Sequence, residues 1–244
     1  ATLRGDVVVS VSSPAVFPLS EWVHVAIVTE QYTTRMYWDG IEVASASGQP
    51  PFSIERSSNY LGNSGFNSLP TFDGKIDDFR VWDRALTPEE ILGNMNNTLT
   101  GNEEDLLLYY NFNDDYGLTV SDKSAVDNTI EGKYVYGTHL VDSTAPIDEA
   151  TVTRVETTYD TTPPEGTPEE VPLTFGNALS FSETGQHLIS TSNVDLQNKA
   201  FTLALWAKVD ANSTGFFMGQ GTGLTNQGLF FGPGGNASIK MGFW

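Results

Sequence analysis

The chain has 244 residues, of which 31 are acidic and 12 are basic, giving a formal net charge of −19, and it contains no cysteine. So acidic a chain is repelled by phosphate backbones and anionic bilayers, which excludes nucleic acid as an expected partner. The lack of cysteine excludes disulfides, thiolate catalysis and cysteine-ligated metal centres. No apolar run approaches the roughly 20 residues of a membrane-spanning helix, so no membrane insertion is expected. The surplus carboxylates either attract divalent cations or simply keep the surface soluble.

Alternation of apolar and polar residues with a period of two dominates the first third of the chain. In residues 21–29, EWVHVAIVT, the side chains of Val23, Val25 and Ile27 fall on one face of a predicted strand. Residues 35–45, RMYWDGIEVAS, predict a hairpin, because Asp-Gly tolerates the positive φ angles of a type I′ turn.

Further short strands follow, separated by glycine, proline and asparagine. Many short strands with turn residues between them predict an antiparallel sandwich and not a parallel α/β sheet. The predicted strands are YLG (60–62), KIDDFRVW (75–82), LLLYYNF (106–112), NALSF (177–181), FTLALWAKV (201–209), FFMGQ (216–220), GLFFG (228–232) and ASIKMGFW (237–244).

One short helix is predicted after the strand at 75–82. Thr87 caps it, and Glu90 completes a Thr-x-x-Glu capping box. Ile91, Leu92 and Met95 then share one face, which predicts a helix that packs on a sheet.

The segment 142–174 differs from the rest in composition, being rich in threonine, proline and acidic residues. Such a segment buries too little apolar surface to offset the entropy lost on ordering. It is predicted to be a long loop or a tether.

Four motifs in the first part of the chain carry a family resemblance. In their order and spacing, SEWVHVAIV, MYWDGIEVAS, YLGNS and FDGKIDDFRVWDRALTPEEI resemble the second half of a laminin G-like module. The resemblance implies the jelly-roll sandwich of the concanavalin A-like lectin/glucanase superfamily. The predicted fold is therefore all-β, with two antiparallel sheets and one short helix.

The remainder of the chain resembles the first half of such a module. The motifs are LLLYYNFNDDYGLTVSDKS, NALSFSETGQHLIST and FTLALWAKV. This match departs from the family pattern at Phe181-Ser182-Glu183, where the family usually has Phe-Asp-Gly. Residues 1–101 are thus predicted to be the second half of a module, and residues 102–244 the first half.

The order of the two halves leaves two arrangements open. The chain is either a stretch of a tandem array, or a repeat read in shifted phase whose halves complete each other. Because a half sandwich exposes sheet edges and an apolar face, the halves must pair, within one chain or between neighbouring copies. Pairing between copies is head-to-tail and builds a fibre if the rotation does not close.

No catalytic pattern is found in the sequence. Concanavalin A-like glucanases carry a Glu-x-Asp-x-x-Glu strand, which this chain lacks. Asp77 and Asp78 are adjacent in a predicted strand, so they are expected to face opposite ways and cannot flank one glycosidic bond. The chain is predicted not to be an enzyme.

Calcium is the predicted cofactor, in a structural role at the rim of the sandwich. Alternation places Asp77 on the same face as Phe79 and Val81, and a core-facing carboxylate needs a partner. In the alternative reading, Asp77 pairs with backbone amides or near Arg80, and the asparagines form turns. The predicted ligands are Asp77, Asn111, Asn113, Asp114 and Asp115.

Ligand contact is predicted at Trp38, the aromatic residue at the mouth of the Asp39-Gly40 hairpin. Most strand aromatics fill the core, so the other tryptophans are not assigned. Asn-x-Ser/Thr sequons at Asn96, Asn212 and Asn236 permit glycosylation in a eukaryotic secretory pathway.

The predicted function is a non-catalytic adhesive or structural module of a secreted or cell-surface repetitive protein, stabilised by calcium. Its expected partners are neighbouring copies or modules of the same protein and cell-surface or matrix glycans or proteins. One alternative is a self-assembling subunit of an extracellular filament, in which neighbouring copies complete each other's half sandwich. Another is a carbohydrate-binding accessory module of a larger enzyme.

Overall fold

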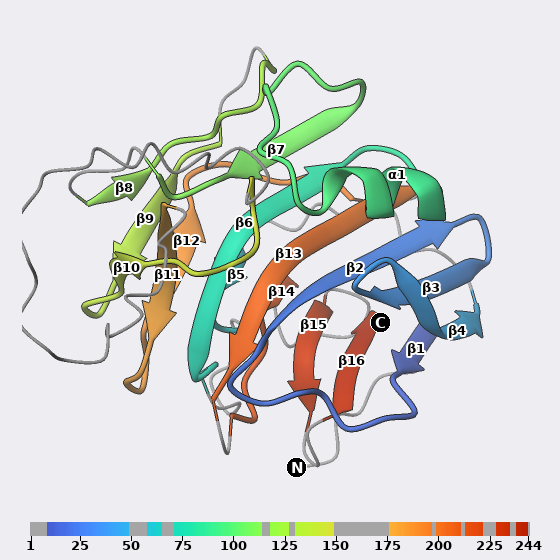
Figure 1. Ribbon diagram of the computed structural model, residues 1–244, viewed down its shortest axis with the longest axis horizontal. Helices are drawn as coiled ribbons and strands as arrows, with labels where there is room; N and C mark the ends of the chain where they lie inside the picture. Colours follow the sequence, from blue (N-terminus) through green and yellow to red (C-terminus); the bar gives the residue numbers. More distant parts are fainter. Residues whose placement is uncertain are drawn as a thin grey trace, which may run out of the picture.

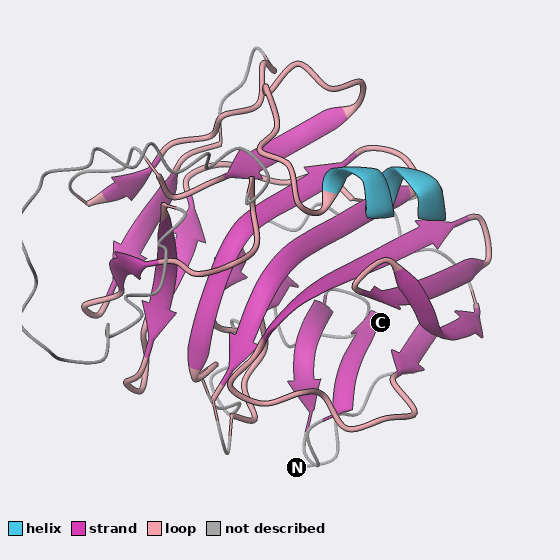
Figure 2. Ribbon diagram, viewed as in Figure 1, coloured by secondary structure: helices cyan, strands magenta, loops and turns pink. Residues whose placement is uncertain are grey.

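A computed structural model shows a sandwich of two antiparallel sheets with one short helix (Figures 1 and 2), which confirms the predicted fold class. The structure describes residues 9–48, 58–64, 71–113, 118–126, 130–148, 176–196, 199–210, 213–221, 228–234 and 238–243.

Sheet A has eight strands. In spatial order they are β1 (Val9–Ser12), β16 (Ser238–Phe243), β15 (Gly228–Gly234), β14 (Met218–Gly221), β5 (Asn59–Leu61), β12 (His187–Ser190), β9 (Gly132–Val135) and β8 (Thr119–Val120).

Sheet B also has eight strands, one of which lies off the main order. In spatial order they are β10 (His139–Asp142), β11 (Asn177–Phe181), β6 (Gly74–Trp82), β13 (Phe201–Val209), β2 (Trp22–Glu30), β3 (Thr33–Trp38) and β4 (Ile41–Ser47), with β7 (Leu106–Tyr110) pairing with β6.

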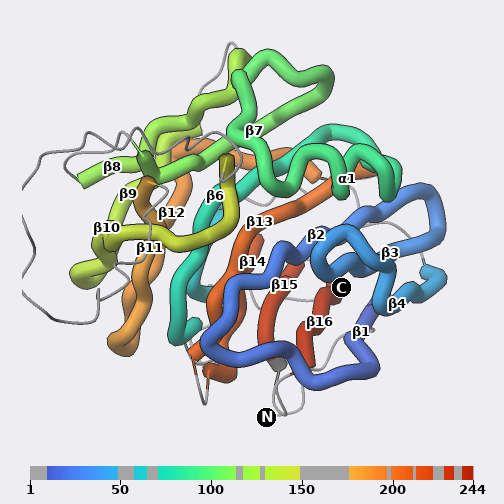
Figure 3. The backbone as a smooth tube through the Cα atoms, in the orientation of Figure 1, coloured from blue at the N-terminus to red at the C-terminus, as the bar shows by residue number. Residues whose placement is uncertain are grey.

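The two parts of the chain interleave in both sheets. The strand β13 lies between β6 and β2 (Figure 3). In sheet A, β5 lies between β12 and β14. At the edge of sheet A, β1 pairs with β16. The sequence left open whether the halves pair within one chain or between copies, and in this structure they pair within one chain.

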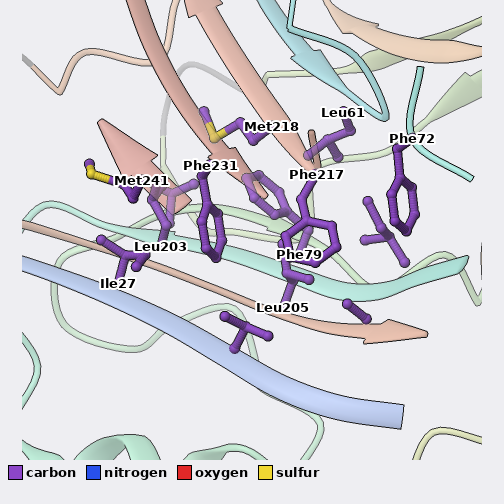
Figure 4. Close-up of a cluster of buried hydrophobic side chains, with 14 of the residues drawn as sticks. Ile27, Leu61, Phe72, Phe79, Leu203, Leu205, Phe217, Met218, Phe231 and Met241 are labelled. Atoms are coloured by element: carbon purple, nitrogen blue, oxygen red, sulfur yellow. The ribbon is translucent and has the colours of Figure 1, made fainter. Parts of the chain in front are cut away.

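A single large core fills the space between the sheets. Alternation along β2 puts Val23, Val25 and Ile27 into this core, as predicted. Residues from both parts of the chain meet there, including Phe79, Phe217 and further labelled side chains in Figure 4. At about 25 cal/mol per Å² of buried apolar surface, this shared core is what holds the two parts together.

The hairpin turn and the start of the helix lie where the sequence predicts. Asp39 (φ 46°) and Gly40 (φ 78°) form the turn between β3 and β4. The helix α1 (Pro88–Asn94) has the predicted capping box: the Glu90 amide donates to the Thr87 hydroxyl at 3.2 Å, and the Thr87 amide donates to the Glu90 carboxylate at 2.8 Å.

The helix packs on sheet B with a narrower face than predicted. Ile91 is buried on the sheet, and Met95 packs beside Trp206. Leu92, predicted on the same face, is 56% exposed and lies against Gly40 at the hairpin turn.

The alternation and turn patterns missed five strands: β1, β8, β9, β10 and β12. Each spans at most four residues, too few to show a period. Residues 143–148, which composition assigned to the loop or tether, are a loop that packs closely, because Ser143, Ala145 and Ile147 are buried on sheet B. Asp142 ends β10, and residues 149–174 lie outside the described residues.

Candidate functional site

A β-bulge in β6 lies at the two adjacent carboxylates. Asp77 pairs with Trp206 of β13 and Arg80 pairs with Ala204, so β6 has one residue more than β13 between the two pairs. Asp78 takes up the extra residue with a φ of 52°, a left-handed conformation that aspartate tolerates better than most residues.

This bulge makes the predicted orientation of Asp77 wrong. Phe79 and Val81 point into the core between the sheets, as expected. Asp77 lies on the opposite face, beside Trp206, because the extra residue at Asp78 interrupts the alternation.

Asp77 is nevertheless buried, at 1% exposure, because residues 143–148 cover this outer face of sheet B. The Ser143 hydroxyl donates to its carboxyl at 2.5 Å. Burial, followed by the neighbouring Asp78, raises the pKa of Asp77 well above its ordinary value, although the bond from Ser143 opposes the change.

Beside it, Arg80 joins the sheet to the C-terminal end of α1. Its guanidinium pairs with the Asp78 carboxylate and donates to the carbonyls of Asn94 at 2.8 Å and Asn97 at 2.6 Å. The Tyr109 hydroxyl donates to the other Asp78 oxygen at 3.1 Å. Burial works to lower the pKa of Arg80, but the Asp78 carboxylate raises it above its ordinary value, so the arginine stays charged.

In each described residue of the predicted calcium site, one side-chain oxygen already accepts a hydrogen bond from a protein donor. Asp77 accepts from Ser143, Asn113 Oδ1 accepts from the Asn177 amide at 2.8 Å, and Asn111 Oδ1 accepts from the Asn113 amide at 3.3 Å. Within the described ranges, no group of three or more His, Cys, Asp or Glu residues could hold a metal ion.

These residues by themselves therefore do not fit a cation that needs six to eight oxygen ligands. The other two predicted ligands, Asp114 and Asp115, lie outside the described residues. The calcium site stays a prediction.

Trp38 is not the exposed ring that the hairpin suggested. Its side chain is partly buried against the core, and its ring meets Phe17 edge-on at 5.2 Å between centroids. Trp38 pairs with Val25 of β2, which also points inward. Among the described residues its indole N–H is buried without a hydrogen-bond partner. Its role in ligand binding stays a prediction.

A cavity of about 20 Å³ lies between the sheets, bordered by Leu61, Phe79 and Met218 among others. This volume admits about one water molecule. This cavity is too small for a sugar ring or a peptide side chain.

The outer face of sheet A carries three aromatic rings in contact. His187 meets Tyr60 at 5.4 Å and Tyr136 at 6.1 Å between ring centroids. Leu61 and Leu188, the neighbours of Tyr60 and His187, point into the core, which turns these two rings outward. We refer to Tyr60, His187 and Tyr136 as the aromatic patch.

The tautomer of His187 follows from its surroundings. Nδ1 lies 2.7 Å from the Gly185 carbonyl, which can only accept, so Nδ1 carries the proton. Burial lowers the pKa of His187, against the opposing effect of this hydrogen bond. The ring is therefore neutral at neutral pH, with Nε2 as its acceptor.

The sequence did not reveal the aromatic patch, because its three residues belong to separate segments. They meet through the pairing of β12 with both β5 and β9. Tyr136 lies in the turn after β9, a strand too short to be predicted. No sequence signal links the three.

Of the three glycosylation sequons, the structure describes the asparagine of one. The Asn96 amide donates to the Pro146 carbonyl at 2.6 Å, and the Thr98 side chain of the same sequon bonds to Asp148. A glycan on Asn96 would have to break this contact. Asn212 and Asn236 lie outside the described residues.

Comparison with known proteins places part of the chain. Residues 2–92 match a laminin G family model, described as the concanavalin A-like lectin/glucanases superfamily. This region is similar to laminin G-like domains. The matched range contains the four motifs from which the resemblance was first inferred, and it covers less than half of the 244 residues. No curated protein and no solved structure matches the chain.

The laminin G-like match supports a carbohydrate-binding or adhesive module in general. Laminin G-like domains are generally non-catalytic and typically extracellular. In the part of the chain that the structure describes, no helix is both long and apolar enough to cross a membrane.

Proposed function

We propose that this chain is a non-catalytic adhesive or structural module of a secreted or cell-surface protein, which binds glycans or neighbouring proteins. The laminin G-like match of residues 2–92 carries the proposal. Strands from residues 176–243 pair with the strands of that region in both sheets. The region is therefore part of a complete two-sheet sandwich.

The setting of the paired carboxylates supports a non-catalytic role. A glycosidase needs two carboxyl groups that flank a glycosidic bond in an accessible cleft. Asp77 and Asp78 are 1% and 2% exposed, and their oxygens are bound by Ser143, Arg80 and Tyr109. Neither can reach a substrate.

The test is binding without turnover. The purified chain is applied to arrays of glycans and of extracellular matrix proteins, and each bound glycan is then assayed for newly released reducing ends. We expect retention on at least one ligand and no release. Release of reducing ends would identify an enzyme, and silence on both arrays would reject the binding module.

Self-assembly is the second proposed function, because the strand pairing is made between two separable parts of the chain. β13 lies between β6 and β2 in the middle of sheet B, and a second copy can supply the same strand with the same pairing. Light scattering after size exclusion, at several concentrations, tests this. Oligomers that grow with concentration favour assembly, and a monomer at every concentration rejects it.

Calcium binding at the rim is a further part of the proposal. A chelator should then lower the melting temperature, and an Asp114→Asn, Asp115→Asn variant should lose this response. Asp77→Asn should keep it, since Ser143 already holds that carboxyl. A melt that the chelator leaves unchanged would remove calcium from the proposal.

A further inference from the structure

Tyr136 is exposed and conformationally strained at the same time. Its side chain is 74% exposed, and its backbone is left-handed at φ 55°. It is followed by Gly137 at φ 77°, so the two residues occupy the centre of a tight turn closed by the Thr138 amide and the Val135 carbonyl at 3.4 Å. Asparagine or glycine is favoured there, and a bulky residue is strained.

The ring of Tyr136 is supported from behind. A Cβ atom on Gly185 would lie 3.4 Å from the ring, so the tyrosine rests on the backbone of that glycine. Gly185 itself has φ 91°, where a side chain is strained. His187 contacts Tyr136, and Tyr60 contacts His187. The patch is therefore packed against the protein on one side, and its other side, the open front, faces solvent.

Polar groups lie next to this open front. The turn between β11 and β12 carries the exposed residues Ser182, Glu183 and Thr184 immediately before Gly185. The neutral His187 ring provides Nε2 as an acceptor. An aromatic surface bordered by hydroxyl groups and acceptors matches a ligand with one apolar face and a polar edge.

We infer that the aromatic patch of Tyr60, His187 and Tyr136 is a binding site for the pyranose ring of an uncharged glycan. The C–H groups on one face of a pyranose are positively polarised and stack on the negative face of an aromatic ring. This inference rests on the proposed function as a binding module and names the site and the ligand class.

The charge of the chain selects among glycans. A net charge of −19 repels sulfated, sialylated and uronate-containing chains at low salt, and the exposed Glu183 in the turn beside the patch does so at short range, where salt screens less. Neutral polysaccharides are the class that combines a stacking face with no repulsion.

The experiment compares two exposed tyrosines. Tyr136→Asn removes the ring and installs a residue that the turn favours, so the variant should fold normally. The matched control is Tyr32→Asn, because Tyr32 is 65% exposed in the turn between β2 and β3 of the other sheet. Binding isotherms are measured on beads coated with a neutral β-glucan, a neutral mannan or a polyuronate, and each variant is melted.

We expect the wild-type chain and Tyr32→Asn to bind a neutral polysaccharide equally well and more tightly than the polyuronate. Tyr136→Asn should bind it about tenfold more weakly or worse, at an unchanged or higher melting temperature. Equal binding by Tyr136→Asn would overturn the patch and leave the proposed function intact. Binding to the polyuronate alone, or to proteins and no polysaccharide, would overturn the ligand class and still leave a binding module. Only silence toward glycans and proteins alike would reject both.

Discussion

The two outer faces of the sandwich differ in how far their polar and aromatic residues are exposed to solvent. On sheet B, α1 and residues 143–148 cover Asp77, Asp78 and Arg80, which are at most 2% exposed. On sheet A, the aromatic patch has a ring that is 74% exposed at Tyr136. The two carboxylates and the guanidinium on sheet B are thus buried, whereas the exposed ring of Tyr136 on sheet A follows a strained backbone.

Residue type alone is therefore a poor guide to function in this protein. Carboxylates and an arginine gathered on one face would suggest catalysis or metal binding. Here they attach a helix and a loop to the sheet, and every guanidinium contact of Arg80 is made inside the protein. Tyr136, in contrast, occupies a left-handed position of its turn at which asparagine or glycine is favoured.

The largest expected effect is a loss of stability when the contacts that cover the outer face of sheet B are removed. Arg80→Leu leaves the buried Asp78 carboxylate unpaired and frees the carbonyls of Asn94 and Asn97. We expect a loss of about 3–5 kcal/mol in the free energy of unfolding, measured by urea denaturation. The control is Arg35→Leu, whose ion pairs are exposed and 3.9 Å long. It should change stability by about 0.5 kcal/mol or less. Equal losses would show that the Arg80 network does not hold the helix.

The next effect concerns pH. Burial, and then the charge of Arg80, lowers the pKa of His24 from 6.5 to about 3. The stabilisation from a neutral His24 is present above pH 6.5 and is lost as the pH falls below it, because the unfolded chain takes up the proton first. Between pH 6.5 and 5 the wild type should lose about 2 kcal/mol relative to His24→Leu.

The difference in the free energy of unfolding between the wild type and His24→Leu reports on His24 alone. Asp77 acts in the opposite sense, since its raised pKa favours the folded state at low pH and that contribution is lost as the pH rises. Both proteins contain Asp77, so its contribution cancels. His139→Leu, at an exposed histidine, is the control and should follow the wild type. Parallel curves for wild type and His24→Leu would contradict the assignment.

Local patterns predicted the elements of this fold well. The alternation in β2, the Asp-Gly pair at residues 39–40 and the capping box at Thr87 each depend on neighbouring residues, and each is found as predicted. The laminin G-like motifs lie in the same region, where the family match confirms them.

The sites could not be predicted in the same way, because they depend on residues far apart in sequence. One inserted residue at Asp78 reverses the face of Asp77, and alternation alone does not reveal a bulge. Trp38 is buried by Phe17, which belongs to a loop. The aromatic patch exists only through the register of three short strands.

A smaller effect on stability is expected at Trp38, whose side chain packs against the core and lies on neither outer face. Trp38→Phe should cost about 1 kcal/mol, because part of the packing on Phe17 is lost while no hydrogen bond among the described residues is broken. Glycan binding, measured on the same coated beads, should not change. A well-folded variant that no longer binds would move the binding site to the hairpin and away from sheet A.

The smallest effect is a gain. Tyr136→Asn should raise the free energy of unfolding by up to about 1 kcal/mol, since asparagine adopts the left-handed conformation at φ 55° more easily than tyrosine. Tyr32→Asn, at a position without a positive φ, should leave it unchanged. Chemical denaturation of the two variants measures the difference. A variant at residue 136 that is more stable and binds less would show that the ring is kept for binding at the expense of the turn. A loss of stability would instead mean that the contacts of Tyr136 with His187 and Gly185 stabilise the fold. The aromatic patch on sheet A would then have a structural role, as the buried residues on the outer face of sheet B do.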